Sequence, residues 1–192
     1  MALAQFTKPA GTWRCEDLPS LPDDGTRYEI IDGELFELSG PRSAHAVAIM
    51  ALIRLLLPLC DRLGLTLLTA ALDVFFAGAD PVQPDLVAFF PGGRARLVDR
   101  GVEGPPDLHI EVLSPPNREH DTVRKRALYA RGGVREYWIV DPDAATIEII
   151  GADGTTVQRL SALTEADFTL RSPLLGELVA NPAAIFPRES RA

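Results

Sequence analysis

The chain has 192 residues and a mass of 20.8 kDa, which suits one domain with a hydrophobic core and is short for two. Acidic residues outnumber basic ones by 27 to 19, so a formal charge of −8 excludes a general basic coat for nucleic acid. Cys15 and Cys60 belong to no metal-ligand motif, which argues against a disulfide scaffold and a structural zinc. The most apolar stretch, 44–60, is interrupted by a histidine, an arginine and a proline. We therefore expect a cytoplasmic protein that does not span a membrane.

The first half of the chain predicts a hairpin, a helix and several buried strands. We expect one folded unit over 20–186, with an N-terminal extension over 1–19 and a tail over 187–192. The segment RYEIIDGELFEL alternates around Asp32-Gly33, a favoured hairpin turn. Helical spacing of apolar residues continues up to Gly64. The predicted elements are strands over 27–31 and 34–38, a helix over 42–63, and strands over 65–71, 73–76, 85–90 and 108–114.

The second half predicts another helix and a second hairpin. Asn117 follows two prolines and is a suitable N-cap for a helix over 118–131 that stops at two glycines. The remaining predicted elements are hairpin strands over 136–140 and 146–150, a strand over 155–160 and a C-terminal segment over 174–186. This order indicates a mixed α/β domain with helices packed on a central sheet.

Two carboxylates lie where strands are expected, and the common phosphate-loop, dinucleotide, nucleophile-elbow and HExxH motifs are absent. Asp85 follows a proline at the start of one strand, and Glu111 lies inside another, on the same face as His109 and Leu113. A lone buried carboxylate costs several kcal/mol unless it is paired, protonated or bound to a metal. Together the two side chains would make a pocket suited to Mg²⁺ or Mn²⁺. Alternatively, Asp85 caps a turn and Glu111 faces solvent or pairs with an arginine.

Lys125 is an exception in a chain that uses arginine almost exclusively, since only two of its 19 basic residues are lysines. It lies in the helix after Glu111, on one stripe with Asp121 and Tyr129. A surface pair between Asp121 and Lys125 would account for the stripe. That pair does not explain a lysine between Arg124 and Arg126, and a compact ammonium can orient a water and stabilise charge on a phosphate. We therefore favour a functional role for Lys125.

Five segments carry a family resemblance: YEIIDGELFEL, the region of His45, QPDLVAFF, IEVLSPPN and DTVRKRALYARGGVREYWIVDP. Over about residues 20–186 the chain resembles the Uma family of endonucleases, members of the PD-(D/E)XK restriction-endonuclease-like superfamily. The resemblance implies a restriction-endonuclease-like core, with a mixed central β-sheet flanked by helices and an N-terminal β-hairpin. It also implies that Asp85 and Glu111 bind the metal. Leu113 stands where the superfamily has its lysine, and Lys125 in the next helix is the matching position.

Other residues match family positions with supporting roles. Glu29 and Glu34 could supply a further metal ligand, although charge on an exposed hairpin explains Glu34 better. His45 matches a family histidine, and a histidine at a helix start is commonly a capping or core-edge residue. We expect the catalytic residues Asp85, Glu111 and Lys125 to be supported by His45, Asp121 and Tyr129.

The resulting hypothesis is a Mg²⁺- or Mn²⁺-dependent endonuclease that hydrolyses DNA phosphodiester bonds. Asp85, Glu111 and the Val112 carbonyl would hold the metal, and Lys125 would position the attacking water. Contact with DNA would be local, because segment 118–135 carries six cations against two acidic residues. The expected phosphate contacts are Arg118, Arg124 and Arg126, with a second basic loop at Arg94, Arg96 and Arg100. Solvated surface charge is the alternative for these arginines.

Two other functions remain open at this stage. One is a catalytically inactive nuclease-fold module that binds DNA or oligomerises, which need not bind a divalent metal. The other is an enzyme that acts on a different phosphodiester or nucleotide. We expect a homodimer because cutting both DNA strands requires two sites, but the sequence does not locate its interface.

Overall fold

The core of the protein is a six-stranded mixed sheet with the strand order β11-β10-β9-β8-β5-β3. The computed structural model describes residues 8–22, 24, 26–38, 43–69, 72–114, 120–164 and 166–186. Neighbouring strands are antiparallel except for the parallel pair of β8 and β9. The strands are β3 (Thr66–Thr69), β5 (Leu86–Phe89), β8 (Leu108–Val112), β9 (Glu136–Asp141), β10 (Thr146–Gly151) and β11 (Thr156–Ser161).

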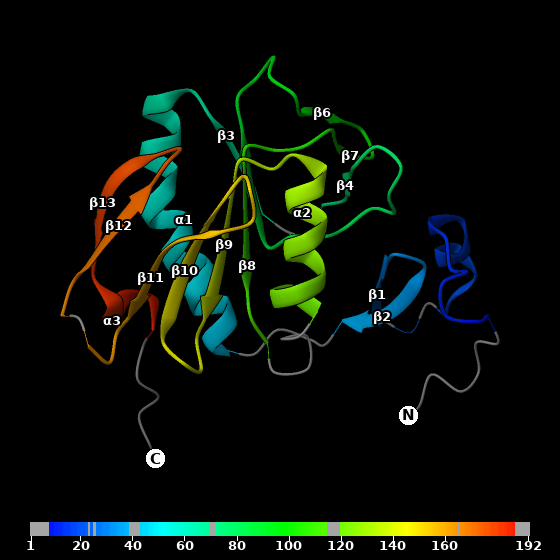
Figure 1. Ribbon diagram of the computed structural model, residues 1–192, viewed down its shortest axis with the longest axis horizontal. Coiled ribbons are helices and arrows are strands. Elements are labelled where there is room, and N and C mark those ends of the chain that lie inside the picture. Colours follow the sequence, from blue (N-terminus) through cyan, green and yellow to red (C-terminus); the bar gives the residue numbers. More distant parts are fainter. Residues whose placement is uncertain are drawn as a thin grey trace.

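Helices α1 (Ser43–Leu63) and α2 (Arg126–Gly132) cover opposite faces of this sheet (Figure 1). Alternate residues of β8 point to opposite faces, so Leu108, Ile110 and Val112 join the core cluster that contains the buried side of α1. Leu113, beyond the end of β8, joins the cluster that contains α2. The predicted sheet buried on both faces is therefore confirmed, and Glu111 points toward the α2 face.

The N-terminal hairpin is confirmed with its predicted bounds, β1 (Arg27–Ile31) and β2 (Glu34–Leu38). Its two turn residues, Asp32 and Gly33, adopt positive φ angles of 52° and 77°, which Asp and Gly tolerate better than most residues. A 3₁₀ helix over Cys15–Ser20 precedes the hairpin. Cys15 and Cys60 are both free thiols, as the sequence indicated.

Two small sheets flank the core, and most of their strands were not predicted. A three-stranded sheet contains the segment predicted as a core strand over 73–76, so that assignment was wrong. The C-terminal segment predicted over 174–186 contains a strand and a short helix, and the strand pairs with one over 168–172 that was not predicted. These elements are β4 (Val74–Phe75), β6 (Arg96–Val98), β7 (Gly101–Glu103), β12 (Phe168–Ser172), β13 (Gly176–Ala180) and α3 (Pro182–Ile185).

The helix predicted over 118–131 is regular only in its second half. Segment His120–Lys125 is a π-helix that continues into α2, and the proposed N-cap Asn117 lies outside the described residues. α2 ends at Gly133, which adopts the left-handed conformation predicted for a glycine stop. π-helical turns are rare and often occur at functional sites, and the spacing of apolar residues does not reveal them.

Within the described residues, α1 is the one helix long and apolar enough to cross a membrane by length and composition. The core helix of a soluble domain passes the same test, and α1 buries Ala48, Leu52, Leu56, Leu59 and Cys60 against the sheet. That the protein does not span a membrane stays a prediction.

Glu136 at the start of β9 ties the central sheet to the small C-terminal sheet. Its buried carboxylate accepts hydrogen bonds from the Trp138 indole, the Ser172 hydroxyl at 3.0 Å and the Leu174 amide at 2.9 Å. We expect Glu136→Ala to lower the free energy of unfolding by about 3–5 kcal/mol, because each buried donor left unpaired costs about 1–3 kcal/mol. Urea unfolding followed by circular dichroism measures this loss.

A matched control is Glu177→Ala on β13, whose side chain is 65% exposed and lies 3.9 Å from Arg171. This exposed pair contributes little, so the control should change the free energy of unfolding by less than about 0.5 kcal/mol. Equal effects of the two substitutions would show that the Glu136 network does not stabilise the fold.

Candidate active site

Asp85 and Glu111 lie side by side at one end of the central sheet. Leu86 of β5 pairs with Ile110 of β8, and the next positions in this register are Asp85 and Glu111. The Val112 amide donates a hydrogen bond of 2.8 Å to Asp85 Oδ2. Asp85 is therefore held by the neighbouring strand, and the alternative that it merely caps a turn after Pro84 does not describe its contacts.

His45 in the first turn of α1 also contacts Asp85. Its Nε2 lies 3.2 Å from Asp85 Oδ2, and the two side chains are 14% and 18% exposed. Its other ring nitrogen is buried and has no hydrogen-bond partner in the described structure. Asp85 Oδ2 thus faces donors from both α1 and β8, which fixes the orientation of the carboxylate.

Glu111 is buried and paired with two side chains of the segment that follows β8. Lys125 Nζ lies 3.0 Å from Glu111 Oε1, and the Tyr129 hydroxyl donates a hydrogen bond of 2.7 Å to the same oxygen. The Glu111 and Lys125 side chains are 4% and 3% exposed. The alternative that Glu111 faces solvent is therefore wrong, and so is the alternative that Lys125 forms a surface pair. The Asp121 side chain lies outside what the structure describes.

The N-terminal hairpin adds a third carboxylate to this group. Glu29 on β1 has a fully buried side chain, and its Oε2 lies 3.2 Å from Lys125 Nζ. Glu34 on β2 instead forms a 2.6 Å ion pair with Arg124, and both side chains are more than a third exposed. Surface charge is thus the correct interpretation of Glu34, and Glu29 joins the buried group.

Glu29, Glu111 and Lys125 form one buried group, whose formal charge is −1 when all three are ionised. Asp85 occupies the register position opposite Glu111 and is held by β8 and α1. Within the described residues, no three His, Cys, Asp or Glu side chains gather into a ready ligand set. Mg²⁺ is usually held by one or two carboxylates and completes its shell with water and substrate phosphate. Asp85 and Glu111 fit that pattern in number and in chemistry, because Mg²⁺ prefers carboxylate oxygens.

His109 and Tyr129 pack next to Glu111 and Lys125, and no sequence pattern predicted that His109 would be buried without a partner. The two rings lie 4.2 Å apart, and His109 is fully buried without a hydrogen-bond partner in the described structure. Burial, and secondarily the positive charge of Lys125, lowers the pKa of His109 to about 3. Burial and the neighbouring Glu111 raise the pKa of Tyr129, so its hydroxyl stays protonated and donates to Glu111.

The buried, neutral His109 predicts a specific pH dependence of stability. An unfolded histidine has a pKa near 6.5, so between pH 6.5 and about 3 the unfolded chain binds a proton that folded His109 does not. Stability should therefore fall as the pH drops through this window, by up to about 1.4 kcal/mol per pH unit from this residue. Urea unfolding at pH 7 and pH 5 measures how much stability each protein loses. The loss should be smaller in His109→Phe than in wild type, because the variant has no histidine at this position to titrate. Equal pH dependence in both would contradict the assignment.

Two of the three expected DNA-contacting arginines have partners within the fold. Arg124 pairs with Glu34 and stacks on the Phe36 ring at 5.0 Å. Arg126 bonds to Glu148 and to the Gly154 carbonyl, and so attaches α2 to the β10–β11 hairpin. Arg118 lies outside the described residues. Of the two described arginines, Arg124 is the one that combines a position near Lys125 with a surface ion pair that a phosphate could replace.

The second basic loop lies away from the carboxylates. It connects the end of β5 to the start of β8, whereas Asp85 precedes β5 and Glu111 lies near the end of β8 (Figure 1). Arg96 and Arg100 of this loop form ion pairs with Glu103. The loop therefore lies at the other end of these strands from Asp85 and Glu111, and its contact with DNA stays a prediction.

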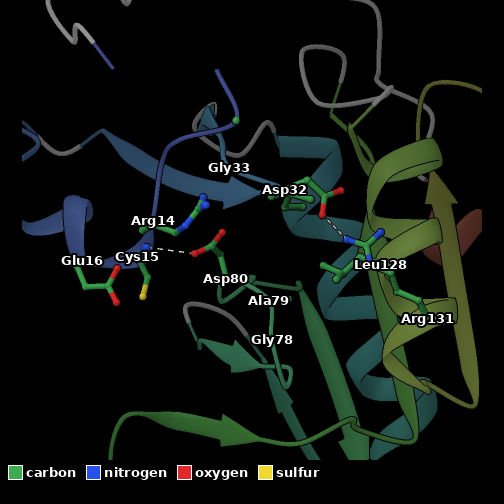
Figure 2. A pocket seen from close by; sticks show the side chains of 12 residues that line it. Arg14, Cys15, Glu16, Asp32, Gly33, Gly78, Ala79, Asp80, Leu128 and Arg131 are labelled. Carbon is green, nitrogen blue, oxygen red and sulfur yellow. Dashed lines mark hydrogen bonds and ion pairs between the residues drawn. The ribbon is translucent and has the colours of Figure 1, made fainter. Parts of the chain in front are cut away.

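A cavity of about 430 Å³ lies beside the turn of the hairpin, and Figure 2 shows its lining. Arg14 and Arg131 line it together with Glu16, Asp32 and Asp80, so its charges nearly balance. Two contacts join residues of its lining: Arg131 pairs with Asp32, and the Cys15 backbone amide donates a hydrogen bond to Asp80. None of the carboxylates around Lys125 lines this cavity, which is therefore separate from the candidate active site.

Comparisons with known proteins agree with this architecture. A family model described as "Uma2: Putative restriction endonuclease" matches residues 15–183 and confirms the resemblance seen in the sequence. A similar solved structure is a "putative nuclease belonging to DUF820" from Anabaena variabilis, with 19% sequence identity and a TM-score of 0.71. The match covers 89% of this chain and 96% of that one and shows a shared fold. No curated protein matches the chain.

Proposed function

The chain belongs to the Uma2 family of restriction-endonuclease-like proteins, and from this premise we propose that it is a Mg²⁺- or Mn²⁺-dependent endonuclease that hydrolyses DNA phosphodiester bonds. One observation carries the proposal. Asp85, just before β5, and Glu111 of the adjacent β8 lie at the same end of the sheet, and a buried lysine contacts Glu111. This arrangement joins metal-binding oxygens to a fixed positive charge, which is the combination that phosphodiester hydrolysis needs.

Asp85 and Glu111, with the Val112 carbonyl, would hold the divalent ion. When bound, the ion lowers the pKa of a water and offsets negative charge on the scissile phosphate. Lys125 places its ammonium at Glu111, where it orients the attacking water and adds positive charge next to the phosphate. Tyr129 and His45 fix the two carboxylates by direct contact, so that both are oriented before substrate arrives.

DNA would approach the end of the sheet where the carboxylates lie. Arg124 is the best placed of the described cations, because it neighbours Lys125 in sequence and its surface pair with Glu34 can exchange for a phosphate. Arg118 would add a second phosphate contact, whereas Arg126 serves mainly to attach α2. We further propose that the protein is a cytoplasmic homodimer, since cleavage of both strands requires two such sites.

A nuclease assay with supercoiled plasmid and linear duplex DNA tests the proposal. We expect cleavage with Mg²⁺ or Mn²⁺ that stops when EDTA is added, and calorimetry should show Mn²⁺ binding to the protein alone. Metal binding without cleavage of any DNA would indicate another phosphodiester or nucleotide substrate. Neither binding nor cleavage would indicate an inactive DNA-binding or oligomerising module and would contradict the proposal.

A further inference from the structure

Glu29 is fully buried, and both of its carboxylate oxygens contact the protein. Oε1 accepts a hydrogen bond of 2.7 Å from the backbone amide of Gln83, two residues before Asp85. Oε2 lies 3.2 Å from Lys125 Nζ. Both oxygens of Glu29 are therefore engaged inside the fold, one by a backbone amide and one by an ammonium. These contacts indicate a role in holding Lys125 rather than the further metal ligand that its family position suggested.

The contacts of Lys125 extend from the hairpin to the central sheet. Its ammonium lies between Glu29 of β1 and Glu111 of β8, at 3.2 Å and 3.0 Å. A buried ammonium has three N–H donors and is costly unless they are paired. Two carboxylates on different elements therefore fix the position of Nζ in two directions, which one carboxylate alone would not do.

Further charge pairs hold the hairpin against the π-helix and α2. Besides Glu29 with Lys125, Glu34 pairs with Arg124 and Asp32 pairs with Arg131. Acidic residues of the hairpin thus face basic residues of the helix segment along its length. This charge complementarity gives the hairpin a defined position, so Glu29 reaches the buried site in a fixed orientation.

We propose that Glu29 is a positioning residue for Lys125, and that the N-terminal hairpin thereby completes the active site. Glu29 holds the ammonium against Glu111 and is not a ligand of the metal. The role of this ammonium in cleavage depends on the function proposed above, whereas the placement of Lys125 by Glu29 can be tested without it.

The placement is tested by a double-mutant cycle in urea unfolding. Glu29→Gln keeps an oxygen that can accept the hydrogen bond from the Gln83 backbone amide, and it removes the negative charge. Lys125→Met removes the ammonium. We expect each single substitution to lower the urea midpoint, and the double variant to unfold no earlier than the less stable single variant, because the two residues act as one pair. Additive shifts would overturn the proposal.

The mode of action is tested with the full chain by Mn²⁺ calorimetry and steady-state cleavage. For Glu29→Gln we expect a Mn²⁺ Kd within about twofold of wild type, an unchanged KM for DNA and a kcat lower by about 10- to 100-fold. The control, Glu37→Gln, removes the same charge from an exposed position on β2 and should change nothing. The kcat of Lys125→Met should not fall further when Glu29→Gln is added.

Two results would overturn the proposal even for a folded variant. Mn²⁺ binding weakened in Glu29→Gln as much as in Asp85→Asn would make Glu29 a ligand. An unchanged kcat would mean that the ammonium needs no support from the hairpin. Failure of the proposed function looks different: the wild type would neither bind Mn²⁺ nor cleave DNA, while the unfolding cycle still showed coupling between Glu29 and Lys125.

Discussion

Replacing Asp85 with Asn, or Glu111 with Gln, is expected to lower the rate of metal-dependent DNA cleavage by at least about a thousandfold. Both changes preserve side-chain size and remove an anionic oxygen from the proposed ligand pair. A bound metal contributes several kcal/mol to transition-state stabilisation, and each 1.4 kcal/mol is a factor of ten in rate. Calorimetry should show weaker Mn²⁺ binding in both variants.

The two variants should differ in stability, which separates chemistry from folding. Asp85 is 18% exposed, so Asp85→Asn should unfold within about 1 kcal/mol of wild type. Glu111→Gln removes one of the two carboxylates that contact the Lys125 ammonium and should be less stable. Glu177→Gln, an exposed change on β13, is the control for both assays. If Asp85→Asn is folded and still cleaves DNA at the wild-type rate, the assigned metal site is wrong.

Local sequence rules were sufficient for the elements that position the site. The Asp32-Gly33 turn fixed the hairpin register, because few residue pairs tolerate two successive positive φ angles. The alternation of β8 separated Glu111 from its apolar neighbours and indicated correctly that it points into a covered face. Both features depend on residues a few positions apart, which is the range over which periodicity carries information.

The sequence was least informative where charges find partners across the fold. Arg126 was a candidate DNA contact from its place in a basic run, but it bonds to Glu148 and Gly154 on a distant hairpin. The basic loop at Arg94 lies at the opposite end of β5 and β8 from the carboxylates. Pairing of surface charges depends on which elements become neighbours, and a count of cations along the chain does not contain that information.

The same limit applies within the candidate site. Three residues stand out in the sequence because charged side chains of their type are unexpected there. Asp85 begins an apolar strand, Glu111 lies inside another, and Lys125 lies between two arginines. The contact of Glu29 with Lys125 brings together residues from the hairpin and the helix, and His109 is a polar ring without a partner in the described structure. Only the packed fold shows that Glu29 belongs to the buried group and that Glu34, five residues away, remains at the surface.

The second large effect is expected at Lys125. Lys125→Met should lower kcat by about 10²- to 10⁴-fold, the range typical of a group that assists proton transfer or stabilises charge in the transition state. Lys125→Arg should not restore activity, because a planar guanidinium is larger than an ammonium and the side chain is only 3% exposed. Single-turnover cleavage with saturating DNA and Mn²⁺ measures the chemical step directly.

Stability must be measured alongside the rate, because Lys125→Met leaves Glu29 and Glu111 buried without the cation between them. This loss is expected to cost about 3–5 kcal/mol in the free energy of unfolding, so cleavage should be assayed well below the unfolding midpoint of each variant. Lys8→Met is the matched control, because Lys8 is the other lysine of the chain and forms an exposed ion pair with Asp17. A Lys125→Arg variant that is folded and fully active would show that the site needs a positive charge and not a compact ammonium. The unusual lysine in this arginine-rich chain would then have no catalytic explanation.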